Sequence, residues 1–173
     1  IVEVSAPSDP ESGSASVDRT FRSLVGRMGL EARPHRTAAI LLNVDQGFRA
    51  PNQDDLTGRQ QVGPGFQFEN ADLQPERALT SELGGRVDLD WLRFEVWVWT
   101  TRIRDGIQRV VREIADCPPS TPDCQGSRDP FQLVNAPDSS RLFGGEGVAG
   151  LSLPQHVALQ GTLSYAWGEG PSL

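Results

Sequence analysis

Two acidic residues, Asp72 and Glu76, lie four positions apart in the stretch NADLQPER and are the first candidates for chemistry. A pair of carboxyl groups can act as acid and nucleophile in glycoside hydrolysis when the fold sets a suitable distance between them. The stretch also contains Pro75, and Asp side chains commonly bond to their own backbone in turns. We therefore interpret both acids as turn residues that lead into a strand, rather than as catalytic groups.

The remaining candidates for catalysis or metal binding are also weak. His35 and His156 both lie in short polar turns, where a solvated side chain is the simpler interpretation. The stretch Gly144-Gly145-Glu146-Gly147 does not match the GxGxxG phosphate-binding pattern, and the sequence contains no serine nucleophile motif. We predict that the protein is not an enzyme and has no bound metal or cofactor.

Cys117 and Cys124 enclose a segment rich in proline, serine and threonine, CPPSTPDC. Such close spacing in a loop indicates a local disulfide formed in an oxidising compartment, with two free thiols as the alternative. A metal site is disfavoured because no histidine or third cysteine lies nearby to complete it.

Composition narrows the class of protein further. The net charge of -7 and the pI near 4.8 argue against a nucleic-acid partner, because no basic patch is present to hold phosphates. No run of about 18 apolar residues occurs, which excludes a transmembrane helix but leaves membrane-spanning strands open. The chain begins IVEVSAP, with neither a start methionine nor a signal peptide, so we expect it to be an internal part of a longer protein.

The stretch from Ala78 to Thr101 predicts a β-hairpin with one apolar and one charged face. Apolar residues alternate with polar ones on both sides of Asp90-Trp91, which we expect to form a two-residue turn. This register places Leu83 opposite Val98 and Val87 opposite Phe94 on the apolar face. On the charged face it pairs Asp88 with Arg93 and Arg86 with Glu95.

Further alternating segments predict long strands on either side of this hairpin. We expect strands at 19–33, 37–48, within 131–153 and at 157–167, and an extension of the second hairpin strand through a bend at Asp105-Gly106 into 107–114. Tight turns are predicted at 33–36, 90–91 and 154–156. Loops are predicted at 1–17, at 49–77, where glycine and proline should prevent regular structure, and around the cysteines at 115–129.

Strict alternation of short and long connections between long strands is typical of an up-and-down membrane barrel. We therefore predict an all-β fold, an antiparallel up-and-down meander of about six long strands that forms an arc of a transmembrane β-barrel. Tyr165 and Trp167 would then lie at the outer membrane interface. The alternative is a secreted or periplasmic soluble β-sandwich that binds carbohydrate or protein, in which Leu83, Val87, Phe94 and Leu163 would be buried against a second sheet.

Six short strings, in this order, resemble the C-terminal barrel half of TonB-dependent outer-membrane receptors. They are Gly47-Phe48-Arg49-Ala50-Pro51-Asn52, Asn70-Ala71-Asp72-Leu73-Gln74-Pro75-Glu76-Arg77, Glu82-Leu83-Gly84, Ile103-Arg104-Asp105-Gly106-Ile107, Val134-Asn135-Ala136 and Gly144-Gly145-Glu146. The resemblance covers roughly 19–168. Ala71 and Gln74 replace the proline and lysine that are usual in the family, and the plug domain, the energy-coupling box and a terminal aromatic strand are lacking. Residues 1–173 are therefore expected to be a partial barrel of this family.

The resemblance implies a segment of an outer-membrane receptor that takes up a scarce ligand, such as a ferric siderophore or a vitamin, by TonB-dependent transport in a Gram-negative cell. Its implied partners are outer-membrane lipid, its own plug domain and the inner-membrane protein TonB. The candidate ligand contacts are Arg49 and Asn52 at an extracellular loop, and Trp97 and Trp99 on the lumenal face. For Arg49 the simpler alternative is an ion pair with a nearby carboxylate, and for the two tryptophans it is contact with the plug or burial in a soluble core. The loop 53–69 contains no histidine, which disfavours haem as the ligand.

Overall fold

The structure, a computed structural model, describes residues 1–8, 14–118, 121–127 and 129–170. The chain forms two compact units. One, here called the loop unit, consists of Ile1–Leu24, Phe48–Arg77 and Arg104–Asp138. The other, here called the sheet unit, consists of Val25–Gly47, Ala78–Ile103 and Ser139–Leu173.

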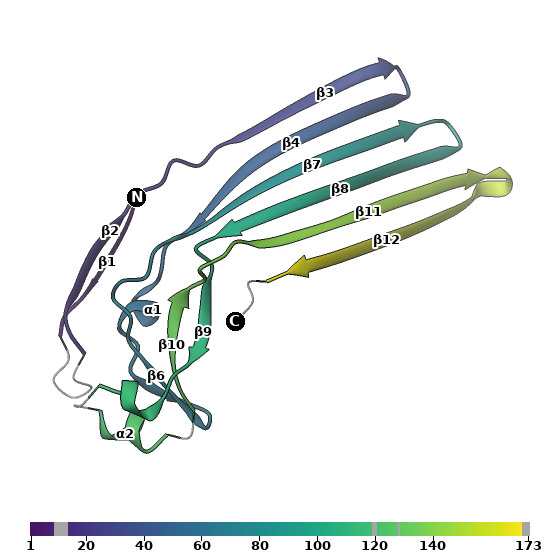
Figure 1. Ribbon diagram of the computed structural model, residues 1–173. Coiled ribbons are helices and arrows are strands. Elements are labelled where there is room, and N and C mark those ends of the chain that lie inside the picture. The colour runs from purple at the N-terminus through teal and green to yellow at the C-terminus, as the bar shows by residue number, and fades with distance from the viewer. Residues whose placement is uncertain (9–13, 119–120, 128, 171–173) are drawn as a thin grey trace. The chain divides into compact units, whose positions relative to one another are not determined.

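The sheet unit is built on six long strands that lie side by side in one sheet (Figure 1). Their order across the sheet is β12-β11-β8-β7-β4-β3. Strands that follow one another along the chain, among these six, are therefore also neighbours in the sheet. The strands are β3 (Arg27–His35), β4 (Ala38–Arg49), β7 (Glu76–Asp88), β8 (Leu92–Arg104), β11 (Ser140–Leu153) and β12 (Val157–Glu169). The predicted antiparallel meander of six long strands is confirmed, and within this chain the barrel is not closed.

Three tight turns join these strands in pairs. The turn at Asp90-Trp91 is confirmed, because Leu89 and Leu92 exchange backbone hydrogen bonds of 2.7 and 3.3 Å. The turn at 154–156 forms the short 3₁₀ element η2 (Pro154–His156). The first turn begins three residues and ends one residue later than the predicted range 33–36: β3 continues to His35, and only Arg36 and Thr37 form the turn.

The apolar face of the sheet is bare. Leu83 is 50% exposed, Phe94 39% and Leu163 79%. The soluble sandwich required these side chains to be buried against a second sheet, so that prediction is wrong. A strand with alternating polarity needs an apolar medium on one side, and here no second layer of the described chain supplies it.

The register of the central hairpin follows the predicted pairing along its length. Asp88 and Arg93 form an ion pair of 3.5 Å, and the Thr80 and Thr101 hydroxyls lie 2.9 Å apart at the other end. The predicted Arg86–Glu95 pair is replaced by other partners. Arg86 pairs with Glu31 of β3 at 3.4 Å, because β3 carries a carboxylate on the same face of the sheet.

The loop unit contains more regular structure than the sequence predicted. The first residues are not a loop: β1 (Val2–Ala6) pairs antiparallel with β2 (Val17–Phe21), while 9–13 lie outside the described residues. The predicted strand at 19–33 is two strands, β2 and β3. A second sheet has the order β5-β6-β10-β9, and the unit also holds the short helices α1, η1 and α2. These elements are β5 (Gln60–Val62), β6 (Gly65–Phe68), β9 (Ile107–Val111), β10 (Asp129–Asn135), α1 (Gln53–Thr57), η1 (Ile114–Asp116) and α2 (Pro122–Gln125).

Two small apolar cores explain why 49–77 is ordered despite its glycines and prolines. Leu56 of α1 and Leu73 are fully buried against Val4, Val17 and Phe21 of the β1–β2 hairpin. A second cluster joins Phe66 and Phe68 of β6 to the two cysteines. Burial of these apolar side chains offsets the conformational entropy lost when the loop is ordered. Among the described residues, no helix is long and apolar enough to cross a membrane.

Candidate functional site

Arg49 and Asn52 lie together at the start of the first long loop. Asn52 caps α1: its side-chain oxygen accepts from the Asp55 backbone N–H at 2.7 Å, and the Asp55 carboxylate accepts from the Asn52 N–H at 3.0 Å. This reciprocal pair is a capping box. The same Asp55 carboxylate accepts from Arg49 Nη2 at 3.1 Å, so a single acid connects both predicted ligand residues.

Glu76 is the second partner of Arg49, and the sequence did not single it out for this role. Arg49 Nη1 donates to Glu76 Oε2 at 3.0 Å, and the backbone N–H of Ile107 donates to Glu76 Oε1 at 2.7 Å. The hydrogen bond to Glu76 is the main cause of the raised pKa of Arg49. Glu76 thereby joins the end of β4 to the start of β9. The contact between Arg49 and Glu76 is the ion pair with a nearby carboxylate that was given above as the simpler alternative for Arg49.

The segment 69–76 is attached to β10 by side-chain amides. Gln132 Nε2 donates to the Glu69 carbonyl at 2.8 Å, and Asn70 Nδ2 donates to the Leu133 carbonyl at 2.9 Å. Asn135 then bonds both backbone groups of Gln74, at 2.7 and 2.8 Å, and also donates to the Asp105 carbonyl at 2.7 Å. The backbone pairing of β6 with β10 ends just before this segment. Beyond that point, the amide side chains of Gln132, Asn70 and Asn135 take over from backbone hydrogen bonds in holding the two chain segments together.

Asp72 belongs to this segment as a turn residue. Its backbone N–H donates to Asn70 Oδ1 at 3.1 Å, which is the geometry of an Asx turn. The turn-forming side chain is therefore Asn70 rather than Asp72. The string Val134-Asn135-Ala136 was visible in the sequence, but its contact with Gln74, 61 positions away, was not.

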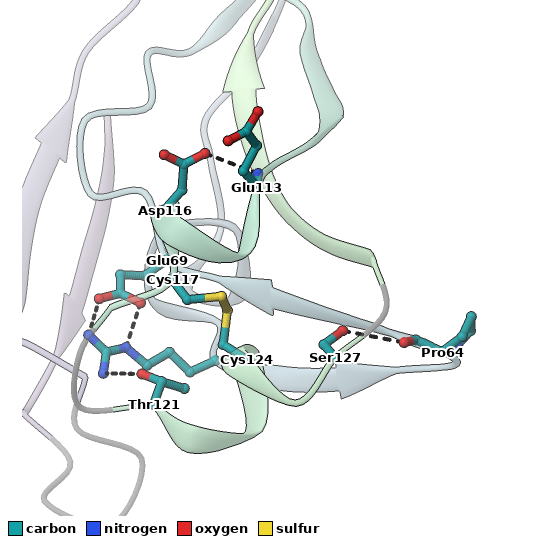
Figure 2. Close-up of a disulfide and its surroundings, with 9 residues drawn as sticks. Pro64, Glu69, Glu113, Asp116, Cys117, Thr121, Cys124 and Ser127 are labelled. Carbon is teal, nitrogen blue, oxygen red and sulfur yellow. Dashed lines mark hydrogen bonds and ion pairs between the residues drawn. A yellow bond between two sulfur atoms is a disulfide. The ribbon is translucent and has the colours of Figure 1, made fainter.

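The parallel pairing of β6 with β10 joins the two long loops, 49–77 and 104–138, into one body. Cys117 and Cys124 form a disulfide, with a sulfur–sulfur distance of 2.04 Å. Figure 2 shows Glu69 and Thr121 on one side of the disulfide and Ser127 beside Pro64 on the other. Arg59 pairs with Glu69 and donates to the Thr121 hydroxyl at 3.2 Å, and the Ser127 hydroxyl donates to the Pro64 carbonyl at 3.3 Å.

Trp97 and Trp99 lie on the charged face of β8, as the alternation predicted. Each indole packs against a glycine of a neighbouring strand: a Cβ on Gly84 would lie 2.6 Å from the Trp97 ring, and one on Gly144 would lie 2.6 Å from the Trp99 ring. Trp97 Nε1 also donates to Glu95 at 2.6 Å. The close approach of ring to backbone requires glycine at both positions.

The two histidines lie in or beside turns. His35 Nδ1 is 2.9 Å from the Thr37 hydroxyl, and His156 is the last residue of η2. The described part of the chain contains no group of three or more histidine, cysteine or acidic side chains that could hold a metal ion.

The sequence matches the family "TonB dependent receptor-like, beta-barrel" over residues 4–172. The chain belongs to this family. Members of the family are transporters of the Gram-negative outer membrane rather than enzymes, so the resemblance seen in the six short strings is confirmed. No curated protein matches the sequence.

Several solved structures share the fold of this TonB-dependent receptor segment. The hemophore receptor HasR of Serratia marcescens, solved with its hemophore HasA and heme, has a TM-score of 0.69 and 19% identity over 90% of this chain and 23% of its own. The siderophore receptor PirA of Pseudomonas aeruginosa has a TM-score of 0.68 and 15% identity over 83% of this chain and 28% of its own. The copper transporter OprC has a TM-score of 0.62 and 20% identity over 84% of this chain and 20% of its own. The chain thus spans between a fifth and three tenths of these receptors.

Proposed function

We propose that this chain is a wall segment of a longer outer-membrane receptor that takes up a scarce ligand, such as a ferric siderophore or a vitamin, by TonB-dependent transport. The observation that carries the proposal is the single open sheet with one bare apolar face and one polar face. Lipid would cover the first face and an aqueous lumen would lie along the second. The strands at the two edges, β3 and β12, would pair with further strands of the same receptor.

The ligand class rests on the neighbours and on the first long loop. HasR, PirA and OprC are described as receptors or transporters for a heme-bearing hemophore, a siderophore and copper. A ferric siderophore is favoured over haem because 53–69 contains no histidine to bind a haem iron. The intact receptor would also require its plug domain and TonB.

Arg49, Asn52, Trp97 and Trp99 remain our candidates for contact with the ligand or the plug. Half of the Arg49 side chain is exposed, so its guanidinium can meet an anionic ligand while it keeps Asp55 and Glu76 as partners. Arg49→Gln in the intact receptor tests this contact. Weaker ligand binding with an unchanged proteolysis pattern of the loops supports it, whereas unchanged affinity contradicts it.

The proposed function is tested by expressing the intact receptor in a Gram-negative strain that lacks its own siderophore receptors. We expect the protein in the outer-membrane fraction, and uptake of radiolabelled iron with at least one of a panel of ferric siderophores. That uptake should disappear when TonB is deleted. A receptor found outside the outer membrane, or uptake that is independent of TonB, would contradict the proposal.

A further inference from the structure

An apolar groove runs along β11 on the bare face of the sheet unit. Its volume is about 540 Å³, and Gly145 and Gly147 of β11 form its floor. The walls are larger apolar side chains that stand opposite these glycines on the two neighbouring strands, namely Val96 and Val98 of β8 and Leu163 and Tyr165 of β12. The groove therefore has both of its walls within this chain.

Packing within the chain does not account for the small residues of the groove. A Cβ on Gly147 would meet only the Glu95 carbonyl oxygen, at an ordinary 3.8 Å, and a Cβ on Gly161, which also lines the groove, would have no neighbour within 4 Å. Gly84 on the polar face differs, because a Cβ there would overlap the Trp97 ring. The space above β11 is thus open to a group from outside the chain.

The loop end of the groove leads to an aromatic pair and then to two arginines. Phe143 and Trp167 follow the groove on the same face, with ring centroids 4.8 Å apart. Beyond them Arg141 of β11 stands directly opposite Arg102 of β8, and both side chains are exposed. Arg141 lies four residues from Gly145, which is about 13 Å along an extended strand.

The two facing arginines lack an acidic partner. Like charges directly opposite each other on neighbouring strands repel, so this pair is unfavourable by itself. Arg102 Nε donates to the Ser139 hydroxyl at 3.1 Å, but within the described part of the chain neither guanidinium has a carboxylate at ion-pair distance. Glu169 faces Arg141 from β12 without such a contact. A phosphate that accepts from both guanidiniums would remove the repulsion.

We propose that this face holds one phosphate-bearing lipid of the outer leaflet, with an acyl chain in the groove and its phosphate between Arg102 and Arg141. The inference rests on the proposed function, because it requires the apolar face in the membrane with the long loops outside. Aromatic side chains mark the boundary between hydrocarbon and headgroups in such barrels, so the groove lies at acyl-chain depth and the arginines at headgroup depth.

The same features disfavour two other occupants. Free phosphate would satisfy the arginines but would leave the groove empty. A second copy of the receptor in the same membrane would have the same orientation, so it would bring its own Arg102 and Arg141 to the same depth and add to the repulsion. Only a lipid carries an apolar chain and an anionic group in the order in which the groove and the arginines occur.

The first test removes the two charges from the intact receptor. The purified protein is titrated with phosphatidylglycerol in detergent, and bound lipids are counted by native mass spectrometry. Arg102→Gln combined with Arg141→Gln should raise the dissociation constant of the most tightly held lipid about tenfold, because two cations that attract its phosphate are lost. Arg86→Gln combined with Arg93→Gln removes two charges from the polar face and should leave this constant unchanged. Equal constants in all three proteins would overturn the proposal.

The second test fills the groove and keeps the charges. Gly147→Leu should also weaken the binding of phosphatidylglycerol, because its side chain would occupy the position of the acyl chain. Gly150→Leu on the polar face is the matched control, since a Cβ there would lie 4.0 Å from Arg93 and has room. Unchanged binding by the Gly147→Leu variant would overturn the proposal. A receptor dimer that this variant abolishes would assign the groove to a second copy instead.

Two further ligands distinguish the source of the phosphate. Phosphatidylcholine, which has no net charge, should bind more weakly than phosphatidylglycerol, and inorganic phosphate should not displace the bound lipid. Equal binding of the two lipids, or displacement by inorganic phosphate, would contradict the proposal. TonB-dependent uptake by the unaltered receptor is measured separately, so a failure of the proposed function would be visible whatever the lipid titration shows.

Discussion

The loop unit and the sheet unit handle apolar side chains in opposite ways. In the loop unit, Leu56 and Leu73 are fully buried and the cysteines are enclosed with Phe66 and Phe68. In the sheet unit, leucine, valine and phenylalanine side chains stand bare along one face. Under the proposed function, the difference teaches that one sequence serves two media: the first unit, in water, builds its own core, while the second would use the bilayer in place of a core.

The sharpest test of this contrast is the same truncation in both units. Leu56→Ala should destabilise the loop unit by about 2–5 kcal/mol, because it opens a cavity in a closed core. Leu159→Ala, at a side chain that is 55% exposed in the sheet unit, should cost only about 1 kcal/mol, because it removes apolar surface that lipid would cover but opens no closed cavity. Proteolysis of the loops would report the first change and urea unfolding in lipid vesicles the second. Similar costs at the two positions would contradict the contrast.

An inserted charge should distinguish the two faces of the sheet. Val96→Arg, near the middle of β8 on the apolar face, should destabilise the receptor in vesicles by about 2–4 kcal/mol, because the guanidinium would lie in hydrocarbon. Glu146→Arg is the control, since Glu146 is exposed on the polar face of the adjacent strand. If the control costs as much as Val96→Arg, lipid does not cover the apolar face.

Removal of the disulfide should affect the loop unit alone. Replacement of both cysteines by serine should cost about 2–3 kcal/mol, because the bridge closes a short segment of the unfolded chain. The loops should then be cleaved faster by protease while the strands of the sheet unit stay protected. A reducing agent should reproduce this result in the unaltered receptor, and loss of strand protection would show that the two units are less independent than their cores suggest.

The smallest expected effect concerns two adjacent glycines of β7. Gly84→Ala should cost about 1–3 kcal/mol, because the new methyl group would overlap the Trp97 ring and force it to move. Gly85→Ala is the matched control, since its methyl group would meet only Val96 at an ordinary 3.7 Å. Unfolding in vesicles and the fluorescence of the tryptophans would check both. Equal stability of the two variants would mean that the close ring contact is dispensable.

The sequence predicted the sheet unit well because its signals are local. The alternation of Leu83 and Val87 with polar neighbours, followed by Phe94 and Val98 across a two-residue turn, defines strands, register and faces within about 20 residues. The start of the first turn was predicted three residues too early because alternation ends gradually near His35. The Arg86–Glu31 ion pair could not be predicted from local signals because β3 is far from this hairpin in the sequence.

The loop unit could not be predicted in this way because its contacts are remote. Gln74 and Asn135 are 61 positions apart, and β6 pairs in parallel with β10 across a similar separation. The glycines and prolines of 49–77 indicate irregular structure, whereas the capping box of Asn52 and Asp55 is the one local signal for α1. The roles of Glu76 and Asn135 depend on backbone groups, which no pattern of residue types reveals.

The parallel pair of β6 and β10 has a consequence for anyone who transplants loops between receptors. A graft that carries 49–77 without 104–138 would deprive Phe66 and Phe68 of the cystine that covers them, and would leave Gln74 without its amide clamp. A transfer of ligand specificity between receptors would therefore have to move both loops together, because each loop depends on contacts with the other.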